Sequence, residues 1–177
     1  MARIATYSTP DPPSIRQRFA AAALDALGID DPEPWFRDAA PCYAAGAKSG
    51  KAWCGIAALA WARSVGLTDW HWKDGVGFLS RLGFNQQTRS PEVGDICYID
   101  KPHRHHCVVV SVNHEAGTVL TVGGNEGSPG AVRGPTERKI NDKRLAFFST
   151  RKWVRDAESR EAAKTDPCPA PPFPVEL

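Results

Sequence analysis

The stretch KAWCGIAALAWARSVG, residues 51–66, places a cysteine in the first turn of a predicted apolar helix. A helix that is apolar on every side belongs in the centre of a fold. At a helix N-terminus, unpaired backbone amides and the positive end of the macrodipole favour a thiolate over a thiol. Cys54 is therefore a candidate nucleophile on a central helix. The apolar stripe of this helix consists of Cys54, Ala58, Trp61 and Val65.

The segments on either side of this helix predict a helical first half. Ser14 is a candidate N-cap for a helix through Leu27, and Asp69 for a weaker helix that runs to Leu82. Two segments without helical periodicity complete this half, an N-terminal arm at residues 1–13 and a proline-containing loop at residues 30–41.

After Gly83 the apolar pattern changes to short β-branched and aromatic runs, which predict strands. Turn residues separate these runs, and strands joined by short loops favour an antiparallel sheet. The sequence thus predicts an α+β fold with helices first and a small antiparallel sheet after them. The expected strands are residues 95–99, 107–112, 118–122 and 145–149.

Length and composition indicate one catalytic domain, which we place at residues 14–155. A chain of 177 residues with 42% apolar content can bury a core of its own. Residues 156–177 form a charged and then proline-rich tail. The formal net charge of +2 argues against binding to nucleic acid, and no window approaches the roughly 20 apolar residues of a membrane span.

Five cysteines occur in the chain, and none forms a Cys-x-x-Cys pair of the kind found in zinc or redox sites. Cys97 and Cys107 lie in apolar strand patterns, where cysteine behaves as a small hydrophobic residue. His105 and His106 are adjacent on a predicted strand and point to opposite faces, so they cannot share one ion without a bulge. We therefore expect neither a metal site nor a cofactor.

Thiol hydrolysis needs a nucleophile, a base, and a third group that orients the base. Cys54, His106 and Asn125 supply these three groups in chain order. Backbone amides at the start of the Cys54 helix would then hold the oxyanion. Asn125 has an alternative role as a turn residue, because Gly-Gly-Asn-Glu-Gly at 123–127 is also a sequence typical of turns.

These residues lie in segments that resemble the CHAP and NlpC/P60 group of papain-like peptidoglycan hydrolases. The resemblance covers residues 35–155 and implies a papain-like fold with helices packed on a small sheet. It implies hydrolysis of an amide or peptide bond in the bacterial wall polymer by Cys54, His106 and Asn125. The matching segments are Trp-Cys-Gly-Ile-Ala-Ala-Leu at 53–59, Pro-Glu-Val-Gly-Asp-Ile at 91–96, His106 before a valine strand, and Val-Gly-Gly-Asn-Glu at 122–126.

The chain also departs from this pattern. His105 stands where family members usually carry glycine, and Cys107 at a valine-like position. We prefer His106 as the base over His105, because the strand after it keeps the family register. Glu126 is a weaker candidate than Asn125 for the orienting group. Trp53, His105 and Glu126 are assigned to substrate binding, and Trp53 has core packing as its alternative role.

Met1–Ser14 lacks the features of a secretory signal, so we expect synthesis in a cytoplasm and action on the wall after release or delivery. The expected partners are peptide stems of peptidoglycan, with no nucleic acid and no membrane insertion, and the expected state is a monomer. A phage lysin, a tail-associated lysin and an antibacterial effector with an immunity protein all fit. The alternatives are a non-catalytic wall-binding module and a thiol enzyme that acts on a host protein.

Overall fold

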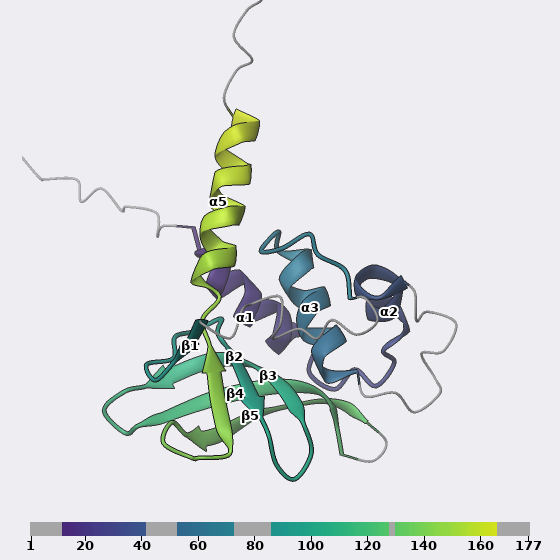
Figure 1. Cartoon of the computed structure of the whole chain (residues 1–177). Coiled ribbons are helices and arrows are strands. Elements are labelled where there is room, and N and C mark those ends of the chain that lie inside the picture. Colours follow the sequence, from purple (N-terminus) through teal and green to yellow (C-terminus); the bar gives the residue numbers. More distant parts are fainter. Residues whose placement is uncertain (1–11, 42–52, 73–85, 128–129, 166–177) are drawn as a thin grey trace, which may run out of the picture.

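The computed structural model describes residues 12–41, 53–72, 86–127 and 130–165. These residues form helices packed against one antiparallel sheet, which agrees with the expected α+β class. In Figure 1, α1 and α3 lie against the sheet, α2 lies beside α3, and α5 extends from the end of β6.

Helix α1 (Ile15–Asp25) begins where the sequence predicts. Ser14 caps it, because its side chain accepts a hydrogen bond from the Gln17 backbone while the Gln17 side chain accepts one from the Ser14 backbone. This reciprocal pair satisfies two amides that have no partner within the helix. The buried face of α1 consists of Ile15, Phe19, Ala20 and Ala23.

The expected loop at residues 30–41 is wrong, because it contains helix α2 (Glu33–Ala39). Pro32 and Pro34 lie at the N-cap and in the first turn, where a missing N–H costs nothing and a fixed φ favours the helix, and Pro41 follows the C-cap Ala40. Phe36 and Ala39 face the core. Pro32 and Pro34 therefore mark the start of a helix, and Pro41 stands just after its end.

Helix α3 (Cys54–Ser64) is the central helix, as predicted, and residues 54–62 are all buried. The expected helix at 69–82 is not confirmed where the structure describes it, because Asp69–Trp72 is not helical. The remainder of that segment lies outside the described residues.

Six strands form the sheet in the order β1-β6-β2-β3-β4-β5, and every neighbouring pair is antiparallel. The four expected strands are confirmed as β2, β3, β4 and β6. The bounds of the strands are β1 (Gln87–Thr88), β2 (Ile96–Ile99), β3 (His105–Asn113), β4 (Thr118–Glu126), β5 (Ala131–Lys139) and β6 (Leu145–Phe148).

Sequence patterns missed β1 and β5. Strand β5 contains Gly134 and Pro135 and is largely polar. It is an edge strand paired only with β4 among the described residues, and edge strands tolerate proline and solvent-facing polar side chains.

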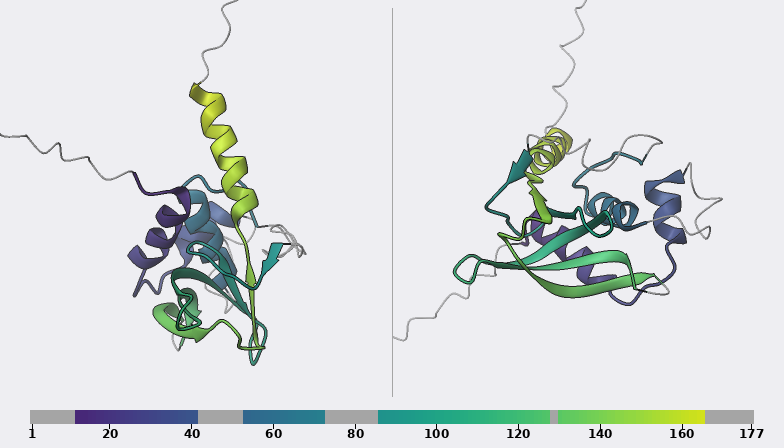
Figure 2. Two further views of the ribbon diagram at one scale, coloured as in Figure 1. Left: turned by 90° about the vertical axis from the view of Figure 1, so that its left-hand side faces the viewer. Right: turned by 60° about the horizontal axis from the view of Figure 1, so that its bottom comes forward.

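The sheet separates two apolar clusters. The larger cluster packs α1, α2 and α3 against one face through Ile96, Val108 and Val122. The smaller cluster lies on the other face and contains Cys97, Cys107, Val109, Val119 and Phe147. Figure 2 shows α1 and α3 on the same side of the curved sheet. Successive residues of β3 therefore alternate between the two clusters, as the pleat of a strand requires.

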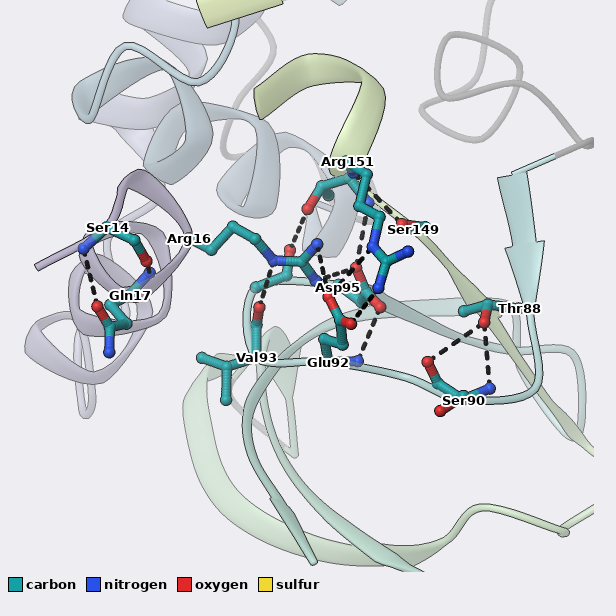
Figure 3. Close-up of polar contacts among 12 residues, drawn as sticks. Ser14, Arg16, Gln17, Thr88, Ser90, Glu92, Val93, Asp95, Ser149 and Arg151 are labelled. Atoms are coloured by element: carbon teal, nitrogen blue, oxygen red, sulfur yellow. Dashed lines mark hydrogen bonds and ion pairs between the residues drawn. The ribbon is translucent and has the colours of Figure 1, made fainter. Parts of the chain in front are cut away.

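A buried carboxylate joins α1, the turn before β2 and the start of α5 (Figure 3). Asp95 is 1% exposed, and its Oδ1 lies 2.5 Å from Arg16 Nη2. The backbone amides of Glu92 and Thr150 also donate to Asp95. Burial raises the pKa of Asp95, against the opposing effect of Arg16. This network fixes the start of β2, the neighbour of the strand that carries His106.

Helix α5 (Arg151–Thr165) runs through residue 155, where we expected the catalytic domain to end. Trp153 and Ala157 are buried in the larger cluster. The Arg160 side chain donates to the carbonyls of Gly66 and Leu67. The first part of the expected tail is therefore packed on the domain. Most of the expected N-terminal arm and the proline-rich end of the tail lie outside the described residues.

Candidate active site

Cys54 is the first residue of α3, as the sequence predicts. Trp53 occupies the N-cap position and makes no side-chain capping bond, and the first intrahelical bond runs from the Ala57 amide to the Trp53 carbonyl at 2.9 Å. The amides of the first turn precede that bond and have no partner within the helix. They and the helix dipole provide positive potential beside the sulfur. Cys54 is 5% exposed.

Strand β3 brings His106 to this sulfur. The Sγ of Cys54 lies 3.7 Å from Nδ1 of His106, a spacing typical of a nucleophile and base before substrate binds. Two aromatic rings lie near the imidazole, with the Tyr98 centroid at 5.2 Å and the Trp72 centroid at 6.4 Å. Tyr98 is the cross-strand partner of His106 in β2. These two contacts therefore restrict the orientation of the ring toward Cys54.

The environment of Cys54 favours its ionised form. Burial alone would raise the pKa of the thiol, but hydrogen bonds and charge interactions with His105 and His106 lower it from 9.0 to about 5. Burial also raises the pKa of the Cys97 thiol, which has no such partners. The structure thus distinguishes Cys54 from a buried thiol of the sheet by the charge on its neighbours.

Two glycines, Gly55 and Gly124, allow the start of α3 to pack closely against the sheet that carries His106. A Cβ at Gly124 of β4 would lie 2.5 Å from Cζ3 of Trp53 and 2.9 Å from Cβ of Ala57. A Cβ at Gly55 would lie 2.8 Å from Trp72 and 3.2 Å from Nδ1 of His106. Larger residues at either position would separate the start of α3 from the sheet, so the glycines set the distance between the sulfur and the imidazole.

Trp53 lies in the core beside the nucleophile. It is 5% exposed and packs on Trp35 with ring centroids 5.4 Å apart. Its remaining face covers Gly124. The structure therefore gives Trp53 the core-packing role that the sequence left as the alternative to substrate binding.

His105, Asn125 and Glu126 line one hollow of about 730 Å³. His105 Nε2 lies 3.0 Å from Oε1 of Glu126, so the two residues assigned to substrate binding contact each other. Burial opposes protonation of His105, but its contacts with Cys107, Cys54 and Glu126 raise its pKa above 6.5. Both histidines therefore interact with Cys54, but the 3.7 Å contact with its sulfur comes from His106, whereas His105 contacts Glu126.

Asn125 has a left-handed backbone, with φ of 61°, at a register shift between β4 and β5. Its side-chain oxygen lies where a side chain on Gly130 would have to go. Left-handed conformations are uncommon outside glycine and are enriched in asparagine. The left-handed backbone is by itself a reason for asparagine at position 125. The assignment of Asn125 as the group that orients His106 stays a prediction.

Tyr98 is a site residue that sequence reasoning missed. Its contact with His106 depends on the register of β2 and β3, and the segment between them, residues 100–104, gives no turn signature that fixes this register.

Comparisons with protein-family models, with curated proteins and with solved structures find nothing that matches this chain. Among the helices of the described residues, none has both the length and the apolar content needed to cross a membrane.

Proposed function

We propose that the protein is a papain-like cysteine hydrolase that cleaves an amide or peptide bond in bacterial peptidoglycan. The observation that carries this proposal is the 3.7 Å contact between Cys54 Sγ at a helix N-terminus and His106 Nδ1 on the adjoining sheet. A helix that carries the nucleophile and a strand that carries the base are also what the resemblance to the CHAP and NlpC/P60 group implies.

The reaction follows from this geometry in two steps. The Cys54 thiolate attacks the carbonyl carbon, and the His106 imidazolium gives its proton to the leaving amine as the C–N bond breaks. Water then attacks the thioester, His106 accepts a proton from it, and the acid product leaves with the thiolate restored. Backbone amides of the first turn of α3 stabilise the oxyanion in both steps.

A second arrangement of the base has one observation in its favour. His105 contacts a carboxylate, Glu126, as the base of a catalytic triad commonly does. In that arrangement His105 would activate Cys54 and Glu126 would orient it. Comparison of His105→Gln with His106→Gln separates the two, because only loss of the true base should remove turnover while leaving the fold intact.

The decisive experiment measures release of new amines and acids from purified peptidoglycan by the full chain. Cys54→Ala and His106→Gln should abolish release, and Asn125→Ala should reduce it by about tenfold or more if Asn125 orients the base. Cys97→Ala is the matched control, because it removes a buried thiol outside the site. Full activity of Cys54→Ala would refute the hydrolase proposal.

The same variants test the alternatives. A wall-binding module would bind peptidoglycan equally well with and without Cys54 and would release nothing. A thiol enzyme directed at a host protein would leave peptidoglycan intact and produce Cys54-dependent cleavage or deamidation in a host lysate. In the proposed role the protein works as a monomer at the wall after release or delivery, as a lysin or as an effector paired with an immunity protein.

A further inference from the structure

Three metal-ligating side chains meet on the face of the sheet that carries Cys107. His105 and Cys107 are two residues apart on β3, and Glu126 comes from the end of β4. Their donor atoms all lie within 4.8 Å of one another. His105 Nε2 is 3.0 Å and Cys107 Sγ is 3.9 Å from the same oxygen, Oε1 of Glu126.

Gly123 provides the space in which these donors converge. It is the cross-strand partner of Cys107, and a Cβ there would lie 2.6 Å from the donor atoms of both His105 and Glu126 and 3.0 Å from Cys107 Sγ. The register shift between Gly123 and Glu126 then places the Glu126 carboxylate beside the two β3 side chains. A glycine at position 123 thus allows the three donor atoms to lie close together over β4.

We propose that His105, Cys107 and Glu126 bind a divalent transition-metal ion, with Zn²⁺ the best match. Thiolate, imidazole and carboxylate are the ligands that Zn²⁺ takes, whereas Mg²⁺ and Ca²⁺ prefer oxygen alone. Tetrahedral zinc bonds would separate nitrogen from oxygen by about 3.3 Å and sulfur from oxygen by about 3.5 Å. The observed 3.0 and 3.9 Å differ from these values by a few tenths of an ångström. The nitrogen and sulfur atoms, which lie within 4.8 Å of each other, would have to come to about 3.5 Å.

The charges of the bound site balance. Zn²⁺ displaces the thiol proton of Cys107 and the proton that His105 carries on its ligating nitrogen, and the resulting thiolate and the Glu126 carboxylate neutralise the ion. Cys107 is fully buried, while the side chains of His105 and Glu126 are 15% and 21% exposed and line the hollow of about 730 Å³. An ion can enter from the hollow, and its fourth position would face that space, as in zinc sites that keep one ligand exchangeable.

This site differs from the pairing considered in the sequence analysis. Adjacent His105 and His106 point to different faces, but His105 and Cys107 share one. Their ion would hold β3 immediately before and after His106. The metal site does not depend on the proposed hydrolase function.

The test loads the chelator-treated full chain with Zn²⁺ and measures the metal retained after gel filtration by elemental analysis. Wild type should retain about one Zn²⁺ per chain. Loss of an outer-shell partner commonly costs 10–100-fold in metal affinity, so His105→Gln, Cys107→Ala and Glu126→Gln should each weaken binding by about 100-fold or more. The Co²⁺-loaded protein should show a thiolate-to-cobalt charge-transfer band that Cys107→Ala removes.

Two cysteine variants are the controls. Cys97 is the cross-strand partner of Cys107, so Cys97→Ala removes a neighbouring buried thiol and should bind Zn²⁺ as wild type does. Cys54→Ala should also keep the metal while losing hydrolysis, which separates this site from the proposed function. Circular dichroism checks that each variant is folded. Glu126→Gln is the ligand variant that leaves the smaller apolar cluster unchanged, because Glu126 is partly exposed and not part of that cluster.

Two results would overturn the proposal. One is a wild-type chain that retains no Zn²⁺ or Co²⁺ after loading. The other is binding that Cys54→Ala removes and Glu126→Gln leaves unchanged, because that would assign the ion to Cys54 and His106.

Discussion

Alkylation of the Cys54 thiol by iodoacetamide should have a pH midpoint of about 5. Interactions with His105 and His106 lower the pKa of Cys54 from 9.0 to about 5 in the folded chain. Because the thiolate is the reactive form, the rate should be constant above about pH 6 and fall about tenfold for each pH unit well below 5. An unperturbed cysteine would instead lose reactivity as the pH falls through 9.

The rate at neutral pH alone does not reveal this difference. At pH 7 a fall in pKa from 9 to 5 raises the thiolate fraction from about 1% to about 99%. Nucleophilicity falls over the same change by about 40- to 100-fold, which nearly cancels the gain. At pH 6 the thiolate fractions differ by about 900-fold, so Cys54 should react about ten- to twentyfold faster than an unperturbed thiol of equal access.

The assay gives short pulses of iodoacetamide to the chelator-treated full chain and quantifies labelled peptides by mass spectrometry. Limited access slows Cys54 at every pH and leaves the midpoint unchanged. Cys97 and Cys107, both fully buried, report unfolding in the same sample. His106→Gln should move the midpoint upward from about 5, because it removes one hydrogen bond and one charge. A wild-type midpoint close to 9, or equal labelling of the three thiols, would refute the reasoning.

Three further predictions concern the scaffold, each measured as the free energy of unfolding in denaturant. Gly124→Ala should destabilise the fold by about 1–3 kcal/mol and slow Cys54 labelling, because its Cβ would lie 2.5 Å from Trp53. Asp95→Asn should cost about 2–4 kcal/mol, because it removes the buried carboxylate that pairs with Arg16 and leaves that guanidinium only the more exposed Glu92. Truncation after Arg155 should cost about 1–3 kcal/mol, because the contacts of the rest of α5 are lost, whereas truncation at the end of that helix should cost little. If the two truncated chains are equally stable, the domain ends at residue 155, as the sequence predicts.

Sequence patterns correctly predicted the helices and strands that are specified by residues within or next to them. The capping pair at Ser14 and the apolar run after Trp53 specify helices, and β-branched runs specify β2, β3, β4 and β6. Prediction failed where neighbours decide the structure. Strand β5 forms because β4 offers it hydrogen bonds, although Pro135 and its polar residues argue against a strand.

The candidate site shows the same division. Chain order and residue type alone predict Cys54, His106 and Asn125 as site residues. Register then decided which groups meet: Tyr98 flanks His106, and Glu126 joins His105. The left-handed backbone of Asn125 and the register shift between β4 and β5 turn Glu126 toward β3. No local sequence pattern predicts this orientation.

The sequence by itself determined that a cysteine begins a central helix and that a histidine-bearing strand follows, because periodicity and helix polarity act over a few residues. Only the tertiary structure decided the 3.7 Å between Cys54 and His106 and the convergence of His105, Cys107 and Glu126. Those distances depend on side-chain volume between layers and on strand register, and residues far apart in the chain set both.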